Sequence, residues 1–329
     1  MRTCPFTFII KKAGYLIMGQ VDLHVHSTSS DGTYTPTELV NYAIEKGLDA
    51  FALTDHDTVD GIDEALAAAK GKPIRVIPGI EYSTRYLDRD VHIVGLFIDY
   101  QSPDFRAYLD QFMKSRTARN HKLCANLQNA GIDISYDALL EMFPHSVITR
   151  AHYAKFLLAH GYVKSHTEAF DRYLGDCTPY FVPRENITPK EVIEVTRKAG
   201  GVPILAHPTL YKLGKEQLDI LVSTLTEQGL MGIECIYSTY TPAEERQIKA
   251  LAEKYHLLPS GGSDFHGATK PGLDLGCGYG RLYVHDTILT NLEKASLSHY
   301  LINIPSMKKP QDKQLLWLLY YINFYNYSL

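Results

Sequence analysis

The chain has 329 residues, and 45% of them are hydrophobic, which is enough for one large α/β domain with an insertion or for two domains. Its formal net charge of −4 and isoelectric point near 6.4 argue against a protein that coats DNA. The five cysteines are scattered and form no Cys-x-x-Cys pair, which is typical of reduced thiols in a cytoplasmic protein and not of metal ligands.

Both ends of the chain differ in composition from the part between them. Residues 1–19 form an N-terminal extension whose short apolar stretch, 6–10, is interrupted by two lysines, so we expect no signal peptide. Residues 301–329 form a C-terminal tail that is apolar and aromatic from 315 onward, too short for the roughly 20 apolar residues that span a bilayer. We expect a packing segment or a poorly ordered tail there and no membrane partner, and we assign neither end a function.

Apolar runs alternate with helical patterns along most of the chain. Several of these runs are almost continuously hydrophobic, as expected for parallel strands that are covered on both faces. The predicted strands are 20–26, 50–54, 74–81, 91–98, 202–207, 232–237 and 257–263.

Three of the intervening helices begin with the same motif. A threonine at the N-cap is followed by proline at the first helical position and glutamate at the third, which makes a capping box with the favoured N-terminal proline. These motifs begin at Thr35, Thr188 and Thr241. Gly47 and Gly200 fit the residue just past a helix end.

Alternating strands and helices predict a parallel sheet or barrel. Seven strands are one fewer than the common barrel has, so we predict an α/β protein with a distorted (β/α)7 barrel, formed by residues 20–100 and 188–300. Residues 101–187 break the alternation and are too long for a plain loop. We interpret them as an inserted helical cap domain, with helices at 105–130, 136–142, 151–160 and 166–174.

The pair His24 and His26 is the most informative motif, because side chains at i and i+2 of a strand point to the same face. Both imidazoles can grip one cation, and Asp31 in the following loop can reach the same site. Similar residues recur at or near the ends of later apolar runs, where barrels build their chemistry. These further candidates are His56, Glu81, His92, His207, Asp264 and His266.

Taken singly, some of these residues have a more ordinary explanation. Asp31 and Asp55 could be turn residues, and His92, within an apolar strand, could be a hydrogen-bonded core histidine. Within Asp55-His56-Asp57 we favour His56 as the ligand, with the two aspartates supporting it. The joint pattern at strand ends makes chance a poor explanation.

The nine candidate ligands offer nitrogen and oxygen but no sulfur, which suits Mn²⁺, Zn²⁺ or Fe²⁺ better than Ca²⁺ or Mg²⁺. A buried carboxylate such as Glu81 would be costly without a cation. The set is more than one ion can use, and it can hold two or three ions if a carboxylate bridges. Clustered divalent ions make hydroxide from water near neutral pH and neutralise the attacking and leaving oxygens, which phosphate ester hydrolysis requires.

The candidate ligands fall into six separated motifs, and their order along the chain resembles that of the PHP (polymerase and histidinol phosphatase) family over roughly residues 20 to 285. The motifs are those of His24, His26 and Asp31; of His56; of Glu81; of His92; of His207; and of Asp264 and His266. The arrangement looks most like the bacterial members that act on 3′,5′-bisphosphate nucleotides and on the 5′ ends of short RNAs. The resemblance implies a distorted seven-stranded barrel with a trinuclear site. It implies one ion held by His24, His26, Glu81 and Asp264, a second held by Glu81, His92 and His207, and a third held by Asp31, His56 and His266.

From these considerations we expect a metal-dependent phosphoesterase with a small nucleotide or a short RNA end as its substrate. Two or three divalent ions per chain are expected, Mn²⁺ first, with Zn²⁺ or Fe²⁺ as alternatives. Glu81, Asp264 and His207 are the ligands predicted to act directly in catalysis.

Two other interpretations stay open. An amidohydrolase-like hydrolase of C–N bonds also uses a His-x-His pair at a barrel rim, but it usually has a lysine that bridges two metals, and no lysine follows a predicted strand end here. The third interpretation is a metal-stabilised PHP module without catalytic activity.

A second phosphate on the substrate would need its own binding residues. Residues 114–122 of the insertion contain no acidic residue, and guanidinium groups match phosphate in a bidentate way. Arg119 and Arg150 are the favoured candidates, with Arg116 in reserve. The alternative is that all three are solvated surface arginines.

Overall fold

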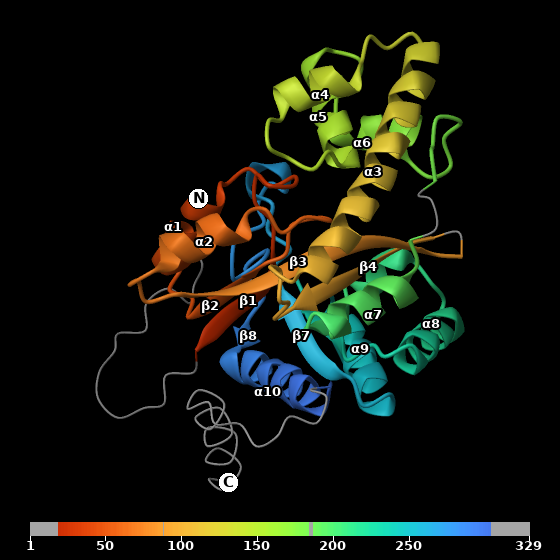
Figure 1. Cartoon of the computed structure of the whole chain (residues 1–329). Helices are drawn as coiled ribbons and strands as arrows, with labels where there is room; N and C mark the ends of the chain where they lie inside the picture. The colour runs from red at the N-terminus through yellow and green to blue at the C-terminus, as the bar shows by residue number, and fades with distance from the viewer. Residues whose placement is uncertain (1–18, 88, 184–186, 304–329) are drawn as a thin grey trace, which may run out of the picture.

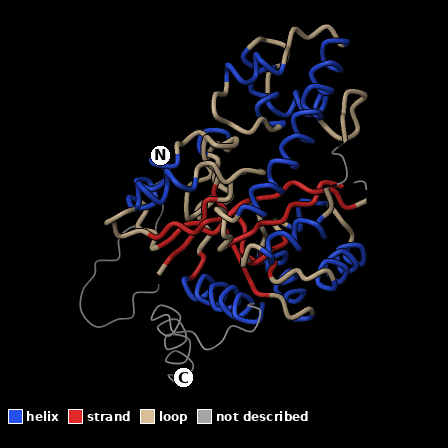
Figure 2. Tube along the Cα trace, in the orientation of Figure 1, coloured by secondary structure: helices blue, strands red, loops and turns tan. Residues whose placement is uncertain are grey.

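Eight strands form one sheet in the computed structural model, in the order β7-β6-β5-β4-β3-β2-β1-β8 (Figures 1 and 2). Val25, at the end of β1, forms a bridge with Phe265, just past β7, so β1 to β7 close into a ring. The two-residue β8 pairs with β1 in antiparallel fashion. The strands are β1 Gln20–Val25, β2 Ala50–Leu53, β3 Arg75–Tyr86, β4 Arg89–Leu96, β5 Val202–Leu205, β6 Gly232–Tyr237, β7 Leu258–Gly262 and β8 Val284–His285.

The structure describes residues 19–87, 89–183 and 187–303. The expected extension at 1–19, apart from its last residue, and the expected tail from 304 onward lie outside the described residues. Each of the seven predicted strands is present, and the distorted seven-membered ring is confirmed.

The expectation that the strands are all parallel is wrong for β4. This strand pairs antiparallel with both β3 and β5, whereas β1, β2 and β3, and likewise β5, β6 and β7, pair in parallel. The cause is a tight return after the twelve-residue β3, where a parallel connection would need a crossover of a dozen residues or more. His92 is therefore in the first half of β4, and Glu81 is within β3, so neither lies at a strand end as expected.

Six helices pack around the ring (Figure 1). The three predicted capping boxes are confirmed at Thr35, Thr188 and Thr241, and Gly47 and Gly200 both have a positive φ of 75°. These helices are α1 Pro36–Glu45, α2 Ile62–Ala69, α7 Pro189–Lys198, α8 Lys215–Glu227, α9 Pro242–Lys254 and α10 Asp286–Asn303, with 3₁₀ turns at Pro208–Tyr211 and Gly267–Thr269.

The insertion rises from the β3–β4 side of the ring on the long helix α3, as the upper part of Figure 1 shows. The predicted helices of this segment are confirmed: α3 Pro103–Asn129, α4 Tyr136–Met142, α5 Arg150–Ala159, and α6 His166–Ala169 continued by a π-helical turn, Phe170–Leu174. From Leu123 onward its apolar residues form a core of their own, whereas Phe105, Leu109 and Phe112 in the first half of α3 belong to the barrel core. The limits at 101 and 187 stay a proposal.

No helix within the described ranges combines the length and the apolar character that crossing a membrane requires.

The closure of the ring predicts a strong dependence on Gly262. A Cβ at this position would lie 2.5 Å from both the backbone nitrogen and the Cβ of His24. We therefore expect Gly262→Ser to lower the free energy of unfolding by about 1–3 kcal/mol in urea titrations. The same substitution at Gly214, which is the N-cap of α8 and has open space around it, should be neutral or stabilising. Equal stability of the two variants would contradict close packing of β1 on β7.

Candidate metal centre

The carboxylate of Glu81 is the centre of the candidate site. Its side chain is 1% exposed, and five imidazoles surround it. Oε1 lies 2.8 Å from His92 Nδ1 and 2.9 Å from His207 Nε2. Oε2 lies 3.2 Å from Nε2 of both His24 and His26 and 3.1 Å from His56 Nδ1. A single carboxylate thus faces two sets of ring nitrogens, one set at each oxygen.

The structure brings all nine predicted ligands together. Three overlapping groups have potential ligand atoms within 4.8 Å of one another: His24, His26, Glu81 and Asp264; His26, Asp31, His56 and His266; and His56, Glu81 and His92. His207 joins them through its contact with Glu81. These residues come from β1, β3, β4 and the segments after β1, β2, β5 and β7, so only the closed ring assembles them.

Several of the buried polar atoms here have no hydrogen-bond partner. They are His24 Nε2, His26 Nε2, Asp31 Oδ1, His56 Nδ1 and His207 Nδ1. Buried polar atoms in native proteins are nearly always satisfied, so a group of exceptions at one place needs an explanation. All five atoms belong to predicted ligands. His24 Nε2, His26 Nε2 and His56 Nδ1 all lie near Glu81 Oε2, and lone pairs that converge in this way, without the alignment of hydrogen bonds, fit a bound cation.

The pKa shifts show that the carboxylates and imidazoles at this point act strongly on one another. Burial disfavours the ionised carboxyl of Glu81, but the surrounding imidazoles of His56, His24 and His92 hold its pKa well below the usual range. Burial also disfavours charged His26, yet Asp264 and Glu81 raise its pKa to about 9. Protons on His24 and His26 thus supply positive charge that metal ions would otherwise supply, whereas burial holds the pKa of His56 well below its usual value.

Glu234, on β6, contacts two candidate ligands, and the sequence interpretation missed it. Its Oε1 accepts from His24 Nδ1 at 2.9 Å, and its Oε2 accepts from the backbone N–H of His207 at 2.6 Å. One carboxylate therefore orients one candidate ligand and the backbone of another, as is usual for metal-binding histidines. The signal was available, because Glu234 is the only charged residue in the buried strand Gly232–Tyr237.

Asp264 is held in a similar way. Tyr237 donates its hydroxyl to Asp264 Oδ2 at 2.5 Å, and the ammonium group of Lys270 contacts the same oxygen. The other oxygen, Oδ1, lies 3.3 Å from His26 Nε2 and 3.3 Å from His266 Nδ1. Oδ2 of Asp264 is thus occupied by Tyr237 and Lys270, and Oδ1 is the oxygen directed at the candidate ligands.

The aspartates that flank His56 support the site, as the sequence suggested, and neither belongs to the three groups. Asp55 accepts hydrogen bonds from the hydroxyls of Ser27 and Ser30, each at 2.6 Å. Asp57 accepts from the backbone N–H of Ser83 at 2.7 Å. Backbone strain is also concentrated at the site, because the non-glycine residues Asp57, His207 and Asp264 have positive φ values of 58°, 28° and 56°.

The three predicted phosphate-binding arginines all contact protein groups. Arg116 is buried, contacts Asp57, and donates its Nε–H to Ile148 O at 3.1 Å. Arg119 is also buried and donates to Val182 O at 2.8 Å. Arg150 is more exposed, and its guanidinium bridges Asp90 at 2.7 Å and Asp176 at 2.5 Å.

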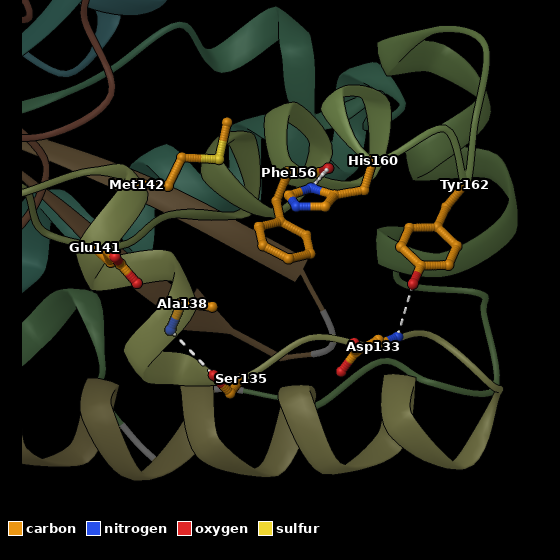
Figure 3. A pocket seen from close by; sticks show the side chains of 8 residues that line it. All are labelled: Asp133, Ser135, Ala138, Glu141, Met142, Phe156, His160 and Tyr162. Carbon is orange, nitrogen blue, oxygen red and sulfur yellow. Dashed lines mark hydrogen bonds between the residues drawn. The ribbon is translucent and has the colours of Figure 1, made fainter.

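A separate hollow of about 450 Å³ lies between α4 and α5 of the insertion (Figure 3). Figure 3 shows the ring of His160 stacked on Phe156, with centroids 4.0 Å apart, and Tyr162 accepting a hydrogen bond from the backbone of Asp133. The carboxylates of Asp133 and Glu141 line this hollow, and none of the nine ligands or the three arginines does. Its charge is unsuited to a phosphate.

Comparison with known proteins agrees with the geometry. The PHP domain family matches residues 22–176. A 5′-3′ exoribonuclease of Haemophilus influenzae is 39% identical over 245 residues, which cover 74% of this chain and 89% of the relative. A 3′,5′-nucleoside bisphosphate phosphatase of Chromobacterium violaceum is 33% identical over 260 residues, which cover 79% of this chain and 91% of the relative.

Two solved structures are also similar. A Bifidobacterium adolescentis chain described as a metal-dependent phosphoesterase has a TM-score of 0.73 and 29% identity, and the match covers 83% of this chain and 95% of that one. A Chromobacterium violaceum chain described as an amidohydrolase, with bound sulfate and no metal, has a TM-score of 0.72 and 33% identity, over 78% of this chain and 90% of that one.

Glu234 provides a test of the site that does not depend on activity. Because groups that orient metal-binding histidines affect metal affinity by about 10- to 100-fold, we expect Glu234→Ala to weaken Mn²⁺ binding by that factor in calorimetric titration. Glu245→Ala, which removes a partly exposed carboxylate of α9 paired with Lys249, is the matched control and should bind like the wild type. Unchanged affinity in Glu234→Ala would mean that its contacts serve the fold alone.

Proposed function

Because this chain belongs to the PHP family of metal-dependent phosphoesterases, we propose that it hydrolyses the 3′-phosphate of 3′,5′-bisphosphate nucleotides and releases nucleotides from the 5′ ends of short RNAs. The observation that carries the proposal is the buried carboxylate of Glu81 between two sets of imidazoles. A bridging carboxylate is what a multinuclear hydrolytic site needs.

Removal of the 3′-phosphate and cleavage at an RNA 5′ end require the substrate to be placed in the same way. In a 3′,5′-bisphosphate nucleotide the reacting phosphorus is attached to the 3′ oxygen of a nucleotide that carries a 5′-phosphate. At the 5′ end of a phosphorylated RNA, the first internucleotide phosphorus has the same position relative to the terminal phosphate. In both cases a bond forms between a water oxygen and phosphorus, the ester bond to the 3′ oxygen breaks, and that oxygen takes a proton.

We propose three ions, assigned as the family resemblance implies. His24, His26, Glu81 and Asp264 would hold the first, Glu81 with His92 and His207 the second, and Asp31, His56 and His266 the third. Mn²⁺ is the metal that we propose first, with Zn²⁺ or Fe²⁺ as alternatives. Such ions, when bound, activate water near neutral pH and offset charge on the attacking and leaving oxygens.

The three residues proposed as catalytic act by holding the reacting centre in place. Glu81 presents one oxygen to each set of imidazoles, so it sets the spacing between them. Asp264 keeps Oδ1 directed inward because Tyr237 and Lys270 occupy Oδ2. His207 is held through its backbone by Glu234, so its Nε2 meets Glu81. Prepositioned charge of this kind needs little reorganisation during the reaction.

We propose Arg119 and Arg150 of the insertion for the second phosphate, with Arg116 in reserve. Arg150 is the most exposed of the three, at 21%, and it lies against Asp90, two residues from His92 on β4. A phosphate that binds there would replace one of its two carboxylate partners. Arg116 is the least suited, because it is buried beside Asp57.

Hydrolysis of a C–N bond is the second candidate, because one similar structure is described as an amidohydrolase. The position between the two sets of imidazoles, where such enzymes usually use a lysine, is held by the carboxylate of Glu81, and this favours the phosphoesterase. We also propose a cytoplasmic location, in keeping with the four described cysteines, which form no disulfide.

A substrate panel tests the proposed function. We expect chelator-treated protein to be inactive and added Mn²⁺ to restore phosphate release from a 3′,5′-bisphosphate nucleotide, with about two or more ions per chain by elemental analysis. Glu81→Ala should lose at least about 100-fold in kcat/KM while keeping its fold, because two sets of ligands lose their shared partner. Turnover of an N-acyl amide in place of phosphoesters would establish the second candidate, and full activity without bound metal would exclude the proposed chemistry.

The arginines are tested by comparing two substrates. Losing one charge-assisted contact costs about 1.5–3 kcal/mol, or roughly ten- to a hundred-fold in kcat/KM. We expect Arg119→Ala and Arg150→Ala to show this loss with the bisphosphate nucleotide and a much smaller loss with an aryl phosphate, which has no second phosphate. Arg172→Ala, an exposed arginine of the same insertion paired with Glu168, is the control. Equal losses on both substrates would assign these arginines to stability or to the reacting centre.

A further inference from the structure

The segment before α5 attaches the insertion to the loop that carries Asp31. The hydroxyl of Ser146 donates to Thr28 O at 2.6 Å, and the backbone N–H of Val147 donates to Ser29 O at 2.9 Å. Two residues later, the hydroxyl of Thr149 donates to Asp31 Oδ2 at 2.9 Å. The insertion therefore contacts a candidate metal ligand directly.

The hydroxyl of Thr149 has a double role, as an acceptor and as a donor. It is the N-cap of α5, where its oxygen accepts from the backbone N–H of Ala151 at 3.2 Å. Its single proton then goes to Asp31 Oδ2, while Lys155, six residues further along α5, donates to the backbone oxygen of Asp31 at 3.1 Å. Both Thr149 and Asp31 are buried.

This hydrogen bond sets the orientation of the Asp31 carboxylate. With Oδ2 occupied by Thr149, Oδ1 is left without a hydrogen-bond partner and lies 3.2 Å from His266 Nε2. His26 Nδ1 and His56 Nε2 each lie 4.0 Å from one of the two oxygens of Asp31. The insertion thus directs one oxygen of Asp31 toward the group His26, Asp31, His56 and His266.

A second connection ends beside another residue of that group. Arg116 of α3 contacts Asp57, the neighbour of His56 in the chain, and also donates to Ile148 O. Asn120 donates to the same carbonyl at 3.2 Å. The residue before Thr149 is therefore fixed by α3, and α3 is fixed to the segment that carries His56.

We propose that docking of the insertion and binding of a divalent ion by Asp31, His56 and His266 stabilise each other, and that Thr149 is the positioning residue that links them. The contact orients Asp31 for the ion, and linkage is reciprocal, so an ion on Asp31 favours the docked insertion. The proposal rests on the metal centre proposed above and not on the identity of the substrate.

The test compares Thr149→Val, which has nearly the same shape but no hydroxyl, with Thr149→Ser, which keeps both the cap and the donor. Chelator-treated proteins are titrated with Mn²⁺ by calorimetry, and hydrogen exchange of residues 146–159 is followed with and without Mn²⁺. We expect one class of ion sites to weaken by about 10- to 100-fold in Thr149→Val, while the remaining sites keep wild-type affinity. Mn²⁺ should slow exchange of this segment in the wild type and in Thr149→Ser, but much less in Thr149→Val.

Ser165→Ala is the matched control, because Ser165 is the N-cap of α6 in the same insertion and donates nothing to the barrel segments described above. It should destabilise the insertion by loss of a cap and leave every ion site unchanged. If Thr149→Val binds all ions as the wild type does, or if Ser165→Ala weakens the same sites equally, the coupling is overturned. If the wild type itself binds no ions, the metal centre and the coupling both fail, whereas wild-type binding without phosphoesterase activity would overturn only the proposed function.

Discussion

The carboxylate of Glu81 is buried among imidazoles at the centre of the fold. A carboxylate kept from water in this way is stable only if positive charge lies beside it. Protons or metal ions can supply this positive charge, but protonation of all five neighbouring imidazoles would place like charges within a few ångströms of one another. Divalent ions supply the positive charge without that repulsion, because neutral imidazoles then act as ligands. The unsatisfied nitrogens of His24, His26 and His56, which face Glu81, follow from the same requirement.

Closure of the ring is what brings these imidazoles to Glu81. The backbone N–H of Asp264 donates to His24 O at 2.9 Å, and that of His26 donates to Phe265 O at 3.0 Å, so the first and seventh strands present their ligands side by side. Gly262 permits this approach because any side chain there would collide with His24. On the other side of the ring, the antiparallel β4 carries His92 back beside Ser83, within reach of Glu81.

The insertion is more than a covering over this centre. Three of its polar contacts with the barrel end on Asp31, on Asp57 beside His56, and on Asp90 two residues from His92, so each of the three reaches a segment that carries a candidate ligand. A phosphoesterase that must hold a second phosphate benefits from this arrangement. The insertion is proposed to recognise the substrate, and the metal centre is proposed to activate water. The two are joined at Asp31, Asp57 and Asp90.

Local patterns in the sequence determined the elements and the ligand types. Period-two spacing placed His24 and His26 on one face, capping boxes marked three helix starts, and polar residues at or near the ends of apolar runs marked the candidate ligands, because each signal depends only on neighbours in the chain. Only the tertiary structure decided the direction of β4, the contact of Glu234 with His24 from 210 residues away, and the burial of Arg116 beside Asp57. These features depend on which segments the closed ring and the docked insertion bring together, and no local spacing contains that information.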